Sequence, residues 1–281
     1  MRVLKGHGTE NDFVVVPDLD GALALTPALV RALCDRHTGI GADGVLRVVR
    51  SENDRDAKEM ALEAPFFMDY RNADGSVAEM CGNGIRVFMR YLQGAGLVDT
   101  SAAVATRGGI RSVVADAGGD FTVDMGHPLV RADRPVVTAA PMAATTGAAI
   151  QLPNPHVVVF LGSRTQLDAL DLSQPPRVDP TGPAGQNVEF VVLSGPRQLF
   201  MRVHERGVGE TRSCGTGICA AAVAAAISDG VGADGLPWRV DVPGGTCTVV
   251  WDDQTGVRLQ GPAVIVGEME LDDAWLRSVA G

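Results

Sequence analysis

The sequence predicts an α+β fold of two pseudo-symmetric lobes, each a curved, mostly antiparallel sheet wrapped around a central helix. Three observations indicate this. A Cys-Gly-X-Gly motif followed by an apolar helix occurs at Cys81 and again at Cys214, 133 residues later in a chain of 281. Strand-like segments outnumber helical ones. The helical run CAAAVAAA at 219–226 carries only small side chains, which allow strands to approach its axis on most sides.

Short apolar runs punctuated by glycine and proline predict the strands. They lie at residues 13–16, 44–50, 157–160, 189–193, 199–204 and 246–251. Asn11-Asp12-Phe13 leads into the first run, and Asn154-Pro155-His156 leads into the third. The same pieces therefore recur in the same order in both halves of the chain.

The first central helix is predicted from the segment AEMCGNGIRVFMRYL at 78–92. Ile85, Phe88, Met89 and Leu92 follow helical spacing, so Cys81 to Gly84 form the start of that helix. A helix start with bare N–H groups is a ready anion site. A single cysteine at such a place is more often a small buried hydrophobe than a reactive thiol.

The repeat divides the chain into an N-terminal lobe, residues 1–124, completed by 266–281, and a C-terminal lobe, residues 125–265. Residues 133–135 and the alanine- and threonine-rich stretch 139–149 are interpreted as the passage between the lobes.

Composition excludes several classes of protein. With 46% hydrophobic and 21% charged residues, the chain is typical of a globular protein without membrane character. A formal charge of −10 and the lack of a basic cluster argue against a nucleic-acid partner. The N-terminal sequence lacks the apolar run of a signal peptide, so we expect a cytoplasmic protein. Five cysteines without compact spacing favour thiols over a disulfide framework.

Two cysteines in matched positions of two facing lobes suggest chemistry in a cleft between the lobes. A helix N-terminus lowers the pKa of a nearby thiol. One thiolate can then remove a proton from a carbon while the other thiol delivers a proton to its opposite face, which inverts the stereocentre. The backbone N–H groups of Gly82, Asn83, Gly215 and Thr216 would hold a carboxylate and stabilise the developing negative charge. This scheme needs no cofactor and no metal.

The chain resembles the diaminopimelate epimerase family, cofactor-independent isomerases of lysine and peptidoglycan precursor biosynthesis. The resemblance covers nearly the whole length and is carried by the segments KGHGTENDFVVV, RHTGIGADGVL, YRNADGSVAEMCGNGIRVF, PNPHVVV, QNVEFV, HERGVGETRSCGTGICAA and VPGGTCTVVW. It implies interconversion of LL- and meso-diaminopimelate by proton transfer at the α-carbon. A small-molecule substrate and a homodimer are the expected partners.

By this resemblance the acid/base pair is Cys81 and Cys214, helped by His156 and Glu205, one near each thiol. The implied substrate-binding residues are Asn11, Asn72, Gly82, Asn83, Asn154, Asn187, Glu205, Arg206, Gly215 and Thr216. Many family members have Leu-Gly at Thr9-Glu10, glutamine at Gly44 and glycine at Pro153. Gly44 has no side chain to contribute, so it is left out of the site.

Plainer interpretations stay open for some of these residues. His156 alone is compatible with a structural histidine that caps a turn. Adjacent Glu205 and Arg206 are compatible with a solvated surface pair. Cys34, Cys219 and Cys247 lie in apolar stretches and are expected to pack in the core.

Two other functions are also compatible with paired thiols. A proline or hydroxyproline racemase would use the same two-base chemistry, but it would not need Arg206 and four asparagines for a distal group. A thiol redox switch would use the two cysteines without catalysis. The polar excess among the predicted site residues favours the longer substrate.

Overall fold

The computed structural model describes residues 1–183 and 185–279. The chain divides into two compact units: unit 1 is Met1–Val123 with Pro262–Gly281, and unit 2 is Asp124–Gly261. Each unit combines a mostly antiparallel sheet with a buried helix, so the predicted two-lobed α+β class is confirmed. Every helix in the described ranges is too short or too polar to span a lipid bilayer.

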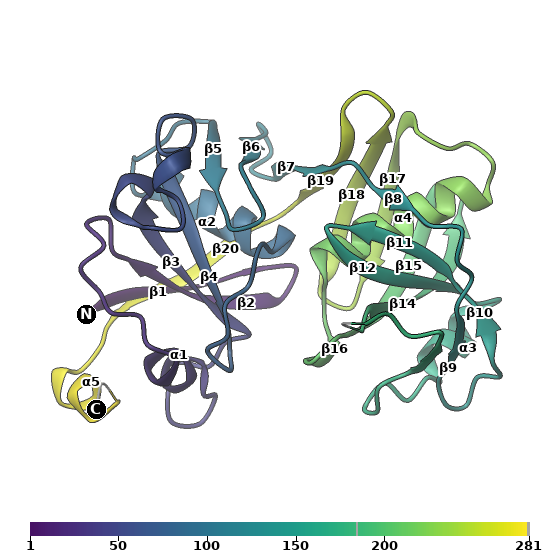
Figure 1. Ribbon diagram of the computed structural model, residues 1–281, viewed down its shortest axis with the longest axis horizontal. Coiled ribbons are helices and arrows are strands. Elements are labelled where there is room, and N and C mark those ends of the chain that lie inside the picture. Colours follow the sequence, from purple (N-terminus) through teal and green to yellow (C-terminus); the bar gives the residue numbers. More distant parts are fainter. Residues whose placement is uncertain (184, 280–281) are drawn as a thin grey trace. The chain divides into compact units, whose positions relative to one another are not determined.

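Unit 1 holds the elements at both ends of the chain (Figure 1). Its strands are β1 (Arg2–Gly8), β2 (Asn11–Pro17), β3 (Gly44–Arg50), β4 (Phe66–Asn72), β5 (Ser101–Ala105), β6 (Arg111–Ala115), the first half of β7 (Phe121–Gly126), and β20 (Val264–Glu270). Its helices are α1 (Pro27–Cys34), α2 (Gly82–Gly94) and α5 (Asp273–Val279), with short 3₁₀ turns η1 (Ser51–Asn53) and η2 (Lys58–Met60).

Unit 2 holds the middle of the chain. Its strands are the end of β7, β8 (Leu129–Val130), β9 (Val136–Thr138), β10 (Thr145–Thr146), β11 (Ala148–Leu152), β12 (Asn154–Phe160), β13 (Arg177–Asp179), β14 (Asn187–Gly195), β15 (Gln198–Glu205), β16 (Gly209–Thr211), β17 (Asp234–Val242), β18 (Gly245–Asp252) and β19 (Gly256–Gly261). Its helices are α3 (Arg164–Asp168) and α4 (Gly215–Ser228).

The two units repeat one pattern of strand pairing. In unit 1, β1 pairs antiparallel with β2, β2 parallel with β3, β3 antiparallel with β4, and β4 parallel with β5. In unit 2, β11, β12, β14, β15 and β17 pair in the same sequence of directions. Phe13 faces Gly44 in unit 1 as His156 faces Asn187 in unit 2. The internal repeat read from the sequence is therefore present in the register of the strands.

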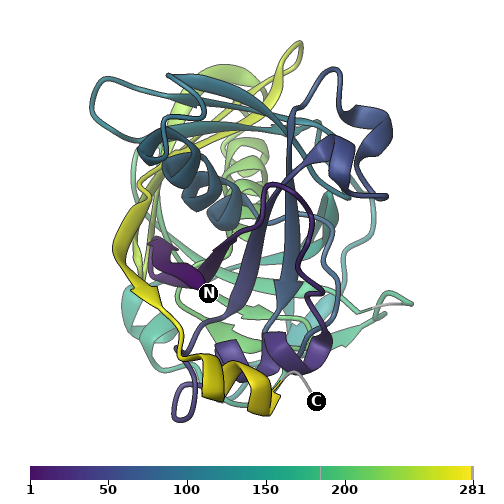
Figure 2. The ribbon, with the colours of Figure 1, turned by 90° about the vertical axis from the view of Figure 1, so that its left-hand side faces the viewer.

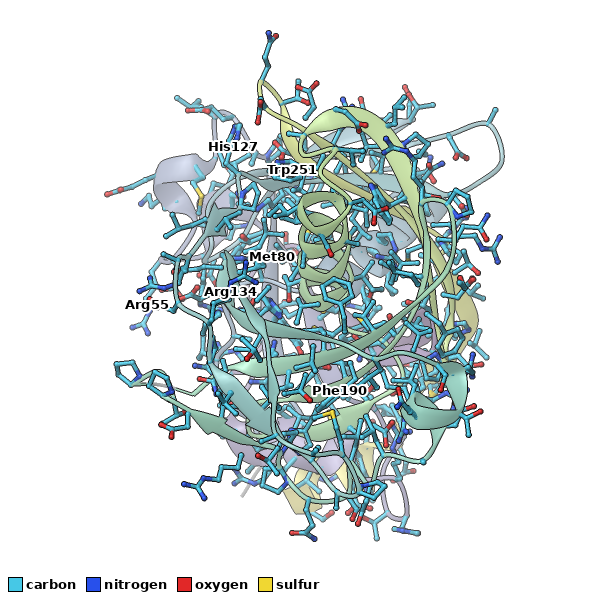
Figure 3. All side chains as sticks on the ribbon, turned by 90° about the vertical axis from the view of Figure 1, so that its right-hand side faces the viewer. Arg55, Met80, His127, Arg134, Phe190 and Trp251 are labelled. Atoms are coloured by element: carbon cyan, nitrogen blue, oxygen red, sulfur yellow. The ribbon has the colours of Figure 1, made fainter. Side chains whose placement is uncertain are left out.

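Each sheet packs against one helix that follows a cysteine. In α2, residues Gly82 to Met89 are buried. In α4, every residue from Gly215 to Ala226 is buried, as the alanine-rich sequence predicts. Figure 3 shows strands of unit 2 around α4. Phe190, labelled there, belongs to a second core cluster with Leu167 of α3.

The C-terminal helix α5 completes unit 1 beside α1 (Figure 2). Leu29, Val30 and Leu33 of α1 share an apolar cluster with Trp275 and Leu276 of α5. Thr26 caps α1, since its side chain accepts a hydrogen bond from the N–H of Leu29. This end of the chain therefore packs against the core of unit 1.

All six predicted strands are observed, with ends that differ by a few residues. The prediction that residues 133–135 and 139–149 form the passage between the lobes is wrong, because both stretches lie inside unit 2. There β9 pairs with β10 and β13 in a small separate sheet. Short strands of alanine, threonine and valine resemble a loop in composition, and their pairing with Arg177–Asp179 is not visible locally.

Candidate active site

Cys81 is the N-cap residue of α2, as predicted. Its sulfur accepts a hydrogen bond from the N–H of Gly84 at 3.4 Å. The residue keeps partial solvent exposure while the helix behind it is buried. The sulfur therefore lies at a helix start, where N–H groups carry partial positive charge.

Asn11 and Asn83 lie beside this thiol. The Oδ1 atom of Asn11 is 3.7 Å from Cys81 Sγ and accepts a hydrogen bond from the Asn83 amide at 3.2 Å. The Asn11 amide nitrogen donates to Asp43 Oδ2 at 2.7 Å. Asp43 was not predicted as a site residue, because its role depends on the approach of its loop to β2.

Asn72 ends β4 and is paired with Gly44 in the register of β3 and β4. Its amide donates to Ser76 Oγ at 3.0 Å. Gly44 is tightly enclosed: a methyl group there would lie 2.6 Å from the carbonyl oxygen of Arg71 and 2.8 Å from the Tyr70 ring. Leaving Gly44 out of the list of side-chain contacts therefore agrees with its surroundings.

Cys214 is the N-cap residue of α4 and, unlike Cys81, is buried. Its sulfur lies 3.5 Å from the Thr216 hydroxyl and 4.0 Å from the Asn187 amide nitrogen. Burial raises the pKa of the Cys214 thiol well above its ordinary value, and the carboxyl groups of Glu205 and Glu189 raise it further. In this environment Cys214 is a neutral thiol.

Glu205 ends β15 next to this thiol. Burial raises the pKa of its carboxyl group, although hydrogen bonds with Thr211 and Cys214 oppose the shift. The Thr211 hydroxyl donates to Glu205 Oε1. This geometry contradicts the surface-pair interpretation of Glu205 and gives Cys214 an adjacent proton acceptor.

His156 is buried on β12 and held from both sides. Its Nδ1 lies 2.7 Å from Glu189 Oε1, and its Nε2 lies 3.1 Å from Asn154 Oδ1. Glu189 of β14 is completely buried and was missed in the sequence. The signal that could have found it is a lone carboxylate inside the apolar run VEFVVL at 188–193.

Arg206 follows Glu205 and is exposed. Its backbone N–H donates to Asn187 Oδ1 at 2.9 Å, so Asn187 contacts both Cys214 and the backbone that carries the arginine. The structure thus gathers the predicted residues in two sets. Unit 1 brings Asn11 and Asn83 to Cys81.

The set in unit 2 is linked to Cys214 directly or through one another by hydrogen bonds and electrostatic interactions. It consists of Asn154, His156, Asn187, Glu205, Gly215 and Thr216. In both helices the first two residues, Gly82-Asn83 and Gly215-Thr216, occupy positions whose N–H groups an α-helix does not use internally. Each thiol therefore stands beside an anion-binding helix start.

No group of three or more His, Cys, Asp or Glu side chains arranged to hold a metal ion occurs among residues 1–183 and 185–279.

Known proteins resemble this chain along nearly its full length. The family model described as diaminopimelate epimerase matches residues 3–130 and 148–266. A diaminopimelate epimerase of Streptomyces coelicolor is 54% identical over 98% of this chain and 97% of its own length. One of Thermobifida fusca is 51% identical over 99% of this chain and 100% of its own.

Solved structures share the fold at low identity. A hydroxyproline epimerase from Agrobacterium vitis, solved with trans-4-OH-L-proline, gives a TM-score of 0.68 at 15% identity, covering 100% of this chain and 98% of its own. A probable proline racemase from Agrobacterium radiobacter gives 0.67 at 16% identity, covering 97% and 93%. At these identities the likeness concerns the fold alone.

Proposed function

Because this chain belongs to the diaminopimelate epimerase family, we propose that it interconverts LL- and meso-diaminopimelate by moving one proton on and one proton off the α-carbon. The observation that carries the mechanism is the repeated placement of a cysteine at the N-cap of the central helix of each unit. Equivalent positions in a repeated fold suit two groups that perform mirror-related tasks.

The proton transfer uses one thiol as base and the other as acid. A thiolate takes the α-proton and becomes a thiol, the electron pair stays on the α-carbon, and the second thiol gives its proton to the opposite face. The second sulfur is left as thiolate, so the two groups have exchanged roles and the stereocentre is inverted. Cys214 starts as the acid, because its buried sulfur is held as a thiol.

The helix starts stabilise the charge that builds up during this step. As the α-proton leaves, negative charge spreads onto the adjoining carboxylate. N–H groups of Gly82, Asn83, Gly215 and Thr216 are the donors that we assign to that carboxylate. Fixed dipoles need no rearrangement when the charge appears, so they favour the transition state over the ground state.

Each thiol has a helper in this proposal. Glu205 accepts the proton of Cys214 when the reaction runs in the direction that needs Cys214 as base, and its hydrogen bond with the thiol supports this role. His156 is the second helper that we assign to the thiol pair. Such assistance by a positioned acid or base contributes roughly 10²- to 10⁴-fold in rate.

The far end of the substrate carries a second carboxylate and a second amine. We assign the distal carboxylate to Arg206, whose planar guanidinium binds carboxylates through two parallel hydrogen bonds. Asn72, Asn154 and Asn187 share the distal groups with it. A protein with a formal charge of −10 has no long-range attraction for carboxylates, so local donors must supply the affinity.

We further propose that the enzyme acts in the cytoplasm as a homodimer. Catalytic thiols need a reducing compartment, which favours the cytoplasm. Light scattering on the purified protein tests the dimer, since a monomeric mass at working concentration would refute it.

Solvent exchange tests the reaction and its substrate together. The protein is incubated in deuterated water with LL-diaminopimelate and, separately, with L-proline. We expect α-deuterium and the meso isomer from diaminopimelate and no label in proline. Label in proline alone would favour a proline racemase. An unlabelled pair of substrates, with the fold verified, would leave the thiol redox switch as the better explanation.

A further inference from the structure

Glu189 is a fully buried carboxylate that the two-thiol reaction does not use directly. Its Oε1 atom lies 2.7 Å from His156 Nδ1. Its Oε2 atom is buried and lacks a hydrogen-bond partner within the described part of the chain. We infer that Glu189 is a positioning residue that fixes the His156 ring by accepting a hydrogen bond from Nδ1. The inference rests on the proposed function, in which His156 assists the proton transfer.

The contacts of the ring define its protons. Nδ1 faces a carboxylate oxygen of Glu189, and Nε2 faces the amide oxygen of Asn154 at 3.1 Å. An ionised carboxylate only accepts hydrogen bonds, so Nδ1 carries the proton that Glu189 accepts. The ring is thereby held between two side chains in a place without solvent.

In unit 1 the positions equivalent to His156 and Glu189 hold uncharged side chains. Phe13 and Leu46 occupy the register positions in unit 1 that His156 and Glu189 occupy in unit 2. Both are completely buried. A methyl group at Gly84 of α2 would lie 3.2 Å from Leu46 Cδ2 and 3.5 Å from Phe13 Cζ. In unit 1 an aromatic and an aliphatic side chain therefore fill the space next to the central helix.

The corresponding contact in unit 2 is ionic. A methyl group at Gly217 of α4 would lie 2.6 Å from Glu189 Oε1. Replacing a buried ion pair by packed apolar side chains is often neutral or stabilising, so the pair is a poor way to build this core. Because Phe13 and Leu46 fill the equivalent place, the charges in unit 2 are better explained by the chemistry than by the fold.

Glu189 has two effects at the site. It orients the His156 ring through the hydrogen bond from Nδ1. It also raises the pKa of the Cys214 thiol, together with burial and Glu205. The titratable groups around the pair are thus Glu205 on β15 and Cys214 at the start of α4. Loss of the Glu189 charge should lower the pKa of the Cys214 thiol.

The test compares three changes at this pair. Glu189→Gln keeps the shape and removes the charge. Glu189→Asp keeps the charge on a shorter side chain. His156→Phe combined with Glu189→Leu copies the pair found in unit 1 and serves as a folded but uncharged reference. Asp241→Asn is the matched control, because it removes a carboxylate of unit 2 that is paired with Arg239 on the surface.

For Glu189→Gln we expect kcat to fall on the order of 10²-fold, the lower end of what a positioned acid or base contributes, with KM nearly unchanged. The alkaline limb of the pH profile should move to lower pH, because the Glu189 charge raises the pKa of the Cys214 thiol. Glu189→Asp should restore part of kcat and of the limb. The double variant should unfold cooperatively and be inactive, and Asp241→Asn should match the wild type.

Ring ¹⁵N shifts of His156 give a readout that does not depend on activity. In the wild type the Nδ1 shift should report a hydrogen bond to a carboxylate, and in Glu189→Gln this shift should change. The inference is overturned if Glu189→Gln keeps the wild-type kcat and pH limbs, or loses activity only through KM or in proportion to unfolded protein. If the wild type does not epimerise diaminopimelate, the proposed function fails, and unchanged ring shifts in Glu189→Gln would then overturn this inference separately.

Discussion

The amide nitrogen of Asn11 donates a 2.7 Å hydrogen bond to Asp43 Oδ2, and this bond turns the Asn11 amide oxygen toward the sulfur of Cys81. The orientation of the amide decides whether an acceptor or a donor faces the thiol. Asp43 therefore determines which polar atom of Asn11, a predicted substrate-binding residue, faces Cys81.

Asp43→Ala should reduce kcat/KM for diaminopimelate by roughly 1.5–3 kcal/mol, because a hydrogen bond to a charged group is lost and Asn11 is no longer held in one orientation. Steady-state kinetics in both directions of the reaction measure this loss. The exposed acid Asp20 of the same unit provides the control variant Asp20→Ala, which should behave as wild type. Equal kinetics for the two variants would show that Asn11 is oriented without Asp43.

Glu205→Gln should lower kcat on the order of 10²-fold, because the amide cannot accept the proton of Cys214. The carboxylate also raises the pKa of the Cys214 thiol, so its removal should move the alkaline limb of the pH profile to lower pH. Thr211→Val removes only the hydroxyl that donates to Glu205 and should have a smaller effect. A pH profile of Glu205→Gln that overlays the wild type would argue against the pairing.

Asp12 links the stability of unit 1 to pH. Burial opposes its ionisation, but hydrogen bonds from Arg36 and Lys5 outweigh burial and lower its pKa from 3.8 to about 2. A pKa that is depressed in the folded state contributes stability above the unfolded value, and this contribution is lost as the pH falls toward 2.

We therefore expect Asp12→Asn to reduce the free energy of unfolding by about 2 kcal/mol at pH 7, since each unit of pKa shift corresponds to about 1.4 kcal/mol. Near pH 2 the difference from wild type should shrink to a small fraction of this value. Urea unfolding at both pH values measures it. An equal difference at the two pH values would mean that the pair does not stabilise the folded state electrostatically.

Arg206→Lys keeps the charge and loses the planar fork, so kcat/KM for diaminopimelate should fall by roughly 1.5–3 kcal/mol, the range for a hydrogen bond to a charged group. Arg206→Met should lose more. Arg239→Lys, on a surface ion pair with Asp241, is the control for the same chemical change. Near-normal kcat/KM for both Arg206 variants would place the distal carboxylate elsewhere.

The fold could be predicted because the two halves of the chain repeat the same motifs in the same order. Cys81 and Cys214 each mark a helix start, and a glycine-rich helix start with an apolar face is a local signal. Asn11 and Asn154 are each the first residue of a strand, and an apolar run follows each of them closely in the sequence. Local spacing therefore led to the two central helices and to most of the strands beside them.

The residues that sequence reasoning missed depend on contacts between distant segments. Parallel pairing of β12 and β14 brings Glu189 close to His156. Asp43 accepts hydrogen bonds from Asn11 and Asp12 at the start of β2. The stretch 133–149 was misread since its pairing partner lies at 177–179. Which distant strands become neighbours depends on the packing of the whole core, so a local pattern does not show it.

The most direct test of the two-thiol reaction is deuterium uptake at the α-carbon by single cysteine variants. LL-diaminopimelate is incubated in deuterated water with wild type, Cys81→Ala, Cys214→Ala and the buried control Cys219→Ala. We predict label and inversion for wild type and Cys219→Ala, and no inversion for either catalytic variant while circular dichroism shows an intact fold. Near-normal formation of the meso isomer by Cys81→Ala or Cys214→Ala would contradict the two-thiol account.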